Sequence, residues 1–210
     1  YLHSRPSNMR NSRISNVALK IANKLSLHHH KQIAYKFLNH NNFLMVAGFC
    51  VEPNRFQSNT FSIRYFIQPL YIKFDYIDLS LGDVIGEWEY TEIDTSLDEI
   101  CRVYNDKLSH LNSIIDVVNA VLNCQIRFYG SSVARTELFA YSYLVLNEYA
   151  QAIPFLTTLI TLNDDDNKEW YSPIISSATH ICKLIQHNNY AEVSDIMLLW
   201  QSYTRGKLGV

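Results

Sequence analysis

The sequence predicts an α+β fold, in which an N-terminal helix packs on a small antiparallel sheet and a bundle of about four to five helices follows. The period of the apolar residues carries this prediction, because it is helical from about residue 14 to residue 38, strand-like from there to about residue 90, and helical again after residue 96. The 210 residues are 48% hydrophobic, which suffices for a sizeable core. Six glycines and five prolines are too few for linker-rich and most small all-β architectures.

The N-terminal part is expected to hold a tail and one helix. Residues 1–13 are polar and are predicted to be a flexible tail. Apolar residues then recur at helical spacing from Ile14 to Leu25, so we expect a helix from about Ile14 to Leu38. The asparagine cluster that begins at Asn39 is expected to end it.

Three segments after this helix have the character of strands. Residues 43–51 form a short apolar run, residues 61–67 alternate between apolar and polar side chains, and residues 71–79 are rich in aromatic and branched side chains. Gly82 and Gly86 are expected to bracket a turn. The prediction is therefore a small antiparallel sheet with the helix packed on it.

The remainder of the chain has helical periodicity. Ser96 and Glu99 have the spacing of a capping box and are expected to begin a helix that continues to Cys124. Gly130 supplies a break, after which three or four further helices are expected. Two units are expected to pack together as one compact body: residues 14–95 and residues 96–210.

A weak internal repeat lies within the helical unit. Residues 148–152 and 189–193 each place a Tyr-Ala pair after a short turn that contains asparagine, and they lie 41 residues apart. Residues 132–205 therefore resemble tetratricopeptide-like helical hairpins. The spacing is not the usual period of about 34 residues, and Pro154 falls inside the first copy. A generic stack of helical hairpins is the broader prediction.

Charge is strongly segregated along the chain. Residues 1–51 contain seven lysines and arginines and no acidic residue, which leaves −9 for the remainder of a chain with net charge −2. One interpretation is that a basic helix packs on an acidic body. The other is an anion-binding face, in which a nucleic acid would contact residues at helical steps. The candidates are Lys20, Lys24, His28 and Lys31.

Two acidic runs are candidates for contacting a basic protein partner. They comprise Glu87, Glu89, Glu92 and Asp94 in the first run and Asp164, Asp165 and Asp166 in the second. In a strand, Glu87 and Glu89 lie on one face and Trp88 on the other. The alternative interpretation is a solvated sheet edge whose aromatic face is buried, while a binding role predicts association that weakens with salt.

Local motifs for catalysis are absent from the sequence. The chain has no phosphate-binding loop, no nucleophile elbow and no pair of ligands at a metal-binding spacing. Successive histidines 28–30 point about 100° apart on a helix, and the loop that begins at Asp164 lacks the glycine and glutamate of a calcium-binding loop. We therefore expect no metal and no cofactor, and an enzyme only if distant residues assemble its site.

The hydropathy of the chain and its cysteines bear on its location. No run of apolar residues is long enough to span a membrane, and the four cysteines form no Cys-x-x-Cys pair, which favours a reducing, cytoplasmic setting. The sequence leaves the oligomeric state open.

Residues 43–79 resemble a group of bacterial α+β proteins associated with toxins. The resemblance rests on Val46-Ala47-Gly48-Phe49, Phe56 and the segment from Phe61 to Tyr71, of which Gln68-Pro69-Leu70-Tyr71 is the most specific piece. It implies an immunity protein, such as those of contact-dependent growth inhibition, that binds and occludes a cognate toxin domain. The leading expectation is thus a non-enzymatic protein-binding protein. The alternatives are a nucleic-acid-binding module and an enzyme.

Overall fold

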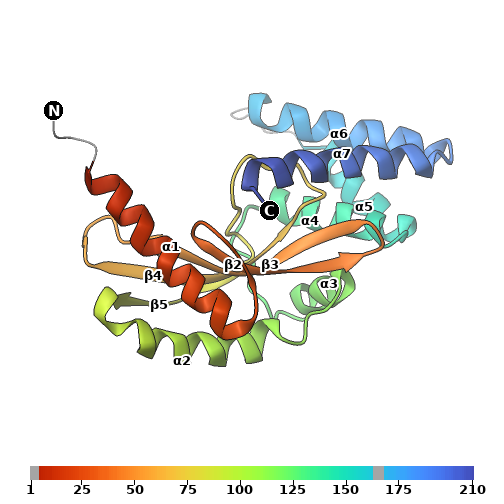
Figure 1. Ribbon diagram of the computed structural model, residues 1–210. Helices are drawn as coiled ribbons and strands as arrows, with labels where there is room; N and C mark the ends of the chain where they lie inside the picture. The colour runs from red at the N-terminus through yellow and green to blue at the C-terminus, as the bar shows by residue number, and fades with distance from the viewer. Residues whose placement is uncertain (1–4, 163–167) are drawn as a thin grey trace.

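The computed structural model describes the backbone of residues 5–162 and 168–210 and confirms the α+β class (Figure 1). A five-stranded antiparallel sheet follows the first helix, and further helices complete the chain. The main elements are α1 (Arg5–Leu25), β1 (His28–His30), β2 (Ile33–His40), β3 (Phe43–Pro53), β4 (Thr60–Pro69), β5 (Gly82–Glu89), α2 (Ile93–Val103), α3 (Ile114–Leu122), α4 (Ser132–Val145), α5 (Tyr149–Ile160), α6 (Lys168–Gln186) and α7 (Tyr190–Leu208).

The strands form a meander in the order β1-β2-β3-β4-β5. The central strand β3 is covered on both faces, which explains its uninterrupted run of apolar residues. Within it, Gly48 lies opposite Tyr35 and Phe66. A Cβ atom at Gly48 would lie 2.0 Å from the carbonyl oxygen of Ala34, so the close approach of β2 and β3 requires glycine at this position.

Helices α1 and α2 cover one face of the sheet (Figure 1). The buried side chains that meet there include Ile14, Val17 and Ile21 of α1, Ile100 of α2 and Ala47, Phe49 and Ile63 of the sheet. The opposite face has a smaller apolar cluster, which includes Val46, Phe66, Leu70 and Leu208. The loop between β4 and β5 and the last turn of α7 supply the cover on that side.

Buried polar side chains hold the C-terminal helix against the sheet. The amide of Gln201 accepts a hydrogen bond from the backbone nitrogen of Leu44 (2.7 Å) and donates one to the carbonyl oxygen of Asn42 (2.9 Å). The hydroxyl of Thr204 donates to the carbonyl oxygen of Ile72 (2.9 Å) and accepts from the backbone nitrogen of Phe74 (3.0 Å). These bonds satisfy backbone groups that no strand partner reaches.

The predicted first helix is wrong at both ends. It begins at Arg5, inside the expected tail, and ends at Leu25 instead of Leu38. Ser26 has a left-handed φ of 56°, and the backbone nitrogen of Leu27 donates to the carbonyl oxygen of Ala22, which together form a Schellman termination. Strands β1 and β2 follow. Adjacent residues of β2 are buried on opposite faces, and this pattern mimics helical spacing.

The predicted third strand and the turn after it are also wrong. Residues 71–79 form a loop whose aromatic and branched side chains cover the sheet, and Gly82 and Gly86 both lie within β5. At Gly82 the backbone has a φ of 142°, and a Cβ atom would lie 2.0 Å from the carbonyl oxygen of Tyr65. This glycine therefore begins a strand at a strained, crowded position.

The predicted helix from Ser96 to Cys124 is divided. Helix α2 begins at Ile93, and the hydroxyl of Ser96 donates to the carbonyl oxygen of Ile93 within the helix instead of capping it. A π-helical turn covers Tyr104–Leu108, and α3 begins after a capping box formed by Ser113 and Asp116. The break near Gly130 is confirmed, because Ser131 caps α4 by accepting from the backbone nitrogen of Ala134 (3.1 Å).

The internal repeat has a structural counterpart, since Tyr149 begins α5 and Tyr190 begins α7 as predicted. Each follows an asparagine with a left-handed φ, 60° at Asn147 and 55° at Asn188. Each tyrosine hydroxyl donates to the side chain of that asparagine, at 3.1 and 3.0 Å. The centroids of the two tyrosine rings are 4.3 Å apart. The two helical hairpins therefore have equivalent turns that contact each other.

Candidate functional site

The loop between β3 and β4 presents an aromatic side chain to solvent. Phe56 is 97% exposed, the largest exposed fraction among the large apolar side chains of the described residues. The loop lies at the end of the sheet where α1 begins and β5 leads into α2 (Figure 1). Burial of a phenylalanine ring away from water lowers the free energy of the system. A phenylalanine whose ring is exposed on an ordered loop is therefore a candidate binding residue.

Hydrogen bonds within the loop fix the position of Phe56. The side-chain oxygen of Asn54 accepts from the backbone nitrogens of Phe56 (2.8 Å) and Gln57 (3.2 Å), which forms an Asx turn. The backbone nitrogen of Asn54 donates to the carbonyl oxygen of Thr60 (3.2 Å). The backbone nitrogen of Thr60 donates to the carbonyl oxygen of Gln57 (3.3 Å). The loop therefore presents the aromatic ring from a closed turn.

Glu87 of the neighbouring strand β5 ties this turn to the sheet. Its carboxylate accepts from the hydroxyl of Thr60 (2.9 Å) and from the side-chain amide of Asn54. The backbone nitrogen of Tyr90 donates to the carbonyl oxygen of Asn59 (3.1 Å). Glu87 thus has a structural role as well as a charge, because it orients the loop that carries Phe56.

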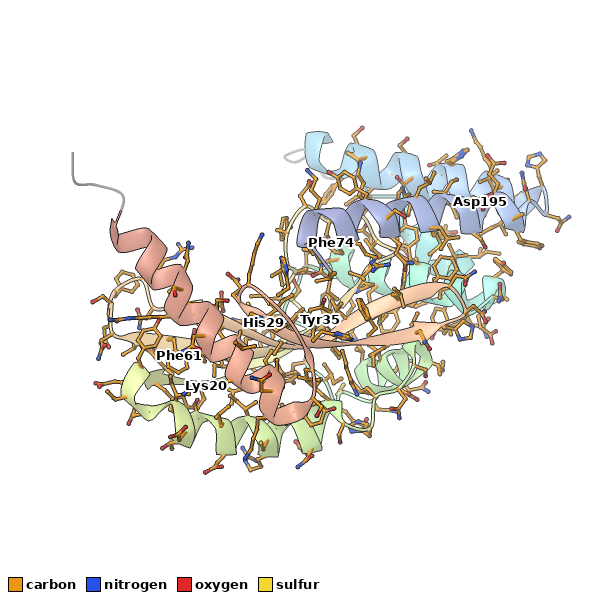
Figure 2. The ribbon with its side chains drawn as sticks, viewed as in Figure 1. Lys20, His29, Tyr35, Phe61, Phe74 and Asp195 are labelled. Carbon is orange, nitrogen blue, oxygen red and sulfur yellow. The ribbon has the colours of Figure 1, made fainter. Side chains whose placement is uncertain are left out.

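An aromatic cluster supports the same end of the sheet. The ring of Phe61 lies 6.3 Å from that of Trp88 and 5.1 Å from that of Tyr90, measured between centroids. The guanidinium of Arg13 lies over the Tyr90 ring at 5.5 Å. Figure 2 shows Phe61 beneath α1 at this end. The basic helix therefore contacts the junction between β5 and α2, where the predicted acidic run lies.

The structure brings the first acidic run together. Glu87, Glu89, Glu92 and Asp94 are all exposed and lie around the junction of β5 and α2. A short 3₁₀ turn covers Tyr90–Glu92. Glu89 and Glu92 cap it reciprocally, and the backbone nitrogen of Glu89 donates to the Glu92 carboxylate at 3.0 Å. Asp94 lies in the first turn of α2, where a negative charge is favourable. The second run, Asp164 to Asp166, lies outside the described residues.

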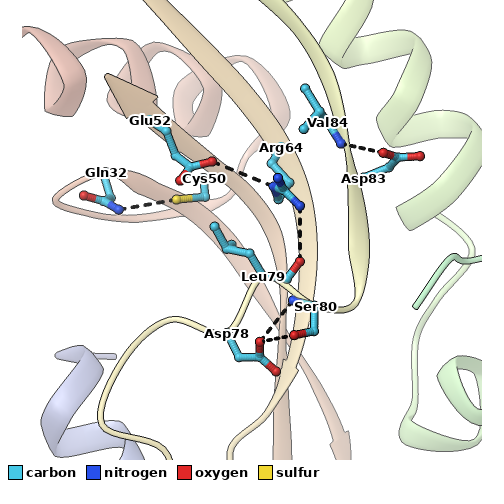
Figure 3. A network of polar contacts seen from close by, with 9 residues as sticks. All are labelled: Gln32, Cys50, Glu52, Arg64, Asp78, Leu79, Ser80, Asp83 and Val84. Atoms are coloured by element: carbon cyan, nitrogen blue, oxygen red, sulfur yellow. Dashed lines mark hydrogen bonds and ion pairs between the residues drawn. The ribbon is translucent and has the colours of Figure 1, made fainter. Parts of the chain in front are cut away.

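The alternation in β5 is as predicted, since Glu87 and Glu89 are exposed and Trp88 is half-buried. The strand is an edge of the sheet and has features that prevent further strand pairing. Its register shifts by one residue beside Arg64, and the Asp83 carboxylate accepts from the backbone nitrogen of Val84 at 2.8 Å (Figure 3). We therefore assign the binding candidate to the loop and the acidic side chains, and not to the strand backbone.

The basic candidates do not form the predicted stripe. Lys20 and Lys24 are exposed on α1, but His28 belongs to β1 and Lys31 lies in the turn to β2 with a left-handed φ of 49°. The prediction of one helical face is wrong because the helix ends at Leu25. All four side chains are exposed, yet only the two on α1 have the predicted spacing.

No family model, curated protein or solved structure matches this chain. Within the described residues, no helix has the length and apolar character needed to cross a membrane. The same residues contain no group of three histidine, cysteine or acidic side chains placed to hold a metal ion. Burial raises the pKa of the Cys50 thiol to about 12, so this thiol is not an activated nucleophile.

The sequence analysis does not single out Phe56 as a candidate binding residue. Its signal is an apolar aromatic residue between two sets of turn-forming residues, Pro53-Asn54 and Ser58-Asn59. Turns usually lie on the surface, so an aromatic side chain between two turns is exposed unless the loop folds back onto the core.

Proposed function

We propose that this chain is a non-enzymatic protein-binding protein. The observation that supports this most strongly is Phe56, which is 97% exposed on a loop that hydrogen bonds hold in place. A rigid aromatic side chain can fill an apolar pocket on a partner without the entropy cost of ordering a mobile loop. The partner would thus carry an apolar pocket that receives this ring.

The acidic side chains at the end of the sheet that carries the Phe56 loop indicate a basic rim on the partner. Glu89 and Asp94 are exposed, and within the described residues neither forms an ion pair. Opposite charge on a partner would accelerate association and would be screened by salt. The nucleic-acid alternative has less support, because the basic candidates lie on three different segments.

In its most concrete form, the proposal is an immunity protein or antitoxin that binds and occludes a cognate bacterial toxin domain in the cytoplasm. The resemblance of residues 43–79 supports this form, and the loop that presents Phe56 lies within that segment. Carboxylates near the loop would substitute for the phosphates that a basic nuclease cleft binds. Four free cysteines accord with a reducing compartment.

Site-specific photo-crosslinking tests the binding role. A benzophenone amino acid replaces Phe56 in one variant and Leu199, which is 70% exposed on α7, in a control variant. We expect one protein to crosslink through position 56 and not through position 199 in the native host. The purified partner should lose about thirtyfold in affinity with Phe56→Ala and stay within twofold with Leu199→Ala. Equal affinity of both alanine variants would refute the proposal.

A growth assay tests the immunity form separately. The captured partner is expressed in a bacterial host, alone and together with this chain. We expect growth arrest by the partner alone, rescue by the unchanged chain and by Leu199→Ala, and little rescue by Phe56→Ala. A partner without any effect on growth would contradict the immunity form and leave only the broader binding role.

A further inference from the structure

A second candidate site lies away from the Phe56 loop. A cavity of about 520 Å³, open to solvent on one side, lies between the loop that joins β4 to β5, the first turns of α4, and α6. Its volume is in the range of small-molecule sites, roughly 300–1,000 Å³. Phe74 and Tyr76 of the loop and Ile174 of α6 supply apolar walls, and Asp78 and Glu137 supply carboxyl groups. Figure 2 shows Phe74 beside α7, in a different part of the molecule from Phe61.

Buried side chains fix the wall that the loop provides. The fully buried Gln68 donates from its amide to the carbonyl oxygen of Tyr76 (3.1 Å) and accepts from the backbone nitrogen of Asp78 (3.1 Å). Thr204 accepts from the backbone nitrogen of Phe74 at 3.0 Å. The rings of Phe74 and Tyr76 meet edge to face, with centroids 6.2 Å apart. These hydrogen bonds therefore fix the position of the aromatic wall.

The two carboxyl groups differ in their partners. The Asp78 carboxylate accepts from the backbone nitrogen and the hydroxyl of Ser80, at 3.0 and 2.6 Å (Figure 3). Glu137 of α4 is half-buried and makes no hydrogen bond or ion pair with any described residue. Burial first, and then the negative charge of Asp78, raise the pKa of Glu137 to about 7.

Nearby cations are engaged elsewhere. The ammonium of Lys73, at the cavity's rim, lies 4.7 Å from the centroid of the Tyr203 ring, on which it stacks. Lys207 pairs with Asp75, with 3.6 Å between nitrogen and oxygen. Among the described side chains, no lysine, arginine or histidine forms an ion pair with Glu137 or Asp78. Lys73 and Asp75 also line the cavity, but Glu137 and Asp78 are left without an ion pair to any described cation.

We propose that this cavity binds an organic monocation, an alkylammonium or alkylguanidinium, whose charged head contacts Glu137 and Asp78 and whose alkyl part packs against Phe74 and Tyr76. Charge-assisted hydrogen bonds to carboxylates and contact with aromatic faces are the interactions that recognise such groups. The inference is independent of the proposed function, because it uses none of the residues around Phe56.

Isothermal titration calorimetry of the full chain at pH 8 tests the proposal with n-butylammonium and n-propylguanidinium chloride as probes. We expect saturable binding of at least one probe and none of n-butanol or butyrate at the same concentrations. Glu137→Gln and Asp78→Asn should each weaken binding about tenfold, the loss expected for one charge-assisted hydrogen bond. Asp195→Asn, an exposed acid on α7 (Figure 2), should leave it unchanged.

A third probe identifies the source of the cation. Nα-acetyl-lysine N-methylamide carries the same alkylammonium on a peptide backbone. Tighter binding of n-butylammonium supports a free amine as the ligand, and tighter binding of the lysine derivative supports a lysine side chain of another protein. The proposal is overturned if neither cation nor the lysine derivative binds, if n-butanol binds equally well, or if the Glu137 and Asp78 variants, confirmed as folded by circular dichroism, bind as the unchanged chain does.

Discussion

Replacement of Glu137 by glutamine should stabilise the protein at neutral and alkaline pH. The pKa of this carboxyl group is raised from 4.5 to about 7 in the folded chain, mainly by burial and further by the charge of Asp78. Burial first, and then the charge of Glu137, raise the pKa of Tyr141, which lies one turn along α4. Because the folded-state pKa lies above the unfolded value, the protonated carboxyl favours folding, and that contribution is lost as the pH rises from about 4.5 through 7.

The shift corresponds to about 2 to 3 kcal/mol at pH 8, after allowance for the partial exposure of the side chain. Glu137→Gln removes the ionisation and keeps the shape. Urea unfolding should therefore show the variant more stable by about that amount at pH 8 and equal to the unchanged chain near pH 4. Asp195 is exposed, so Asp195→Asn should change the free energy of unfolding by the same small amount at pH 8 and at pH 4. A Glu137→Gln variant that is no more stable at pH 8 would refute the reasoning.

Two further substitutions test the fold. The half-buried ammonium of Lys36 donates to the carbonyl oxygens of Leu108 and Leu111, each at 2.7 Å, so Lys36→Met should cost about 2 to 4 kcal/mol by urea unfolding. A loss below 0.5 kcal/mol, typical of an exposed lysine, would contradict this role. Gly48→Ala should abolish soluble expression or lower the melting temperature sharply, because the new Cβ would lie 2.0 Å from the carbonyl oxygen of Ala34; an unchanged melting temperature would show that β2 moves aside.

The strands were predictable where local pattern and tertiary burial agree. Strand β3 has an apolar run because both of its faces are covered, and β4 alternates from Phe61 to Tyr65. The sequence predicts helix where β2 lies, because the adjacent residues Ile33 and Ala34 are both apolar and are buried on opposite faces of the sheet. The sequence predicts a strand for residues 71–79, whereas the chain there is a loop held by hydrogen bonds from distant residues such as Gln68 and Thr204.

The candidate sites were predictable only in part, because a local sequence pattern does not show which distant residues the fold brings together. The acidic residues from Glu87 to Asp94 are close in the sequence, and the structure gathers them at one end of the sheet. Their link to the Phe56 loop depends on the pairing of β4 with β5, which a local search does not reveal. Asp78 and Glu137 come from a loop and a helix that only the folded chain brings to one cavity.

The affinity of a crosslinked partner for two alanine variants tests the central claim most directly. The partner is the protein captured through position 56, and its dissociation constant is measured for the unchanged chain, Phe56→Ala and Leu199→Ala. We predict that Phe56→Ala weakens binding about thirtyfold while the melting temperature stays the same, since the ring is 97% exposed. Equal dissociation constants for all three chains would contradict a binding role for the loop.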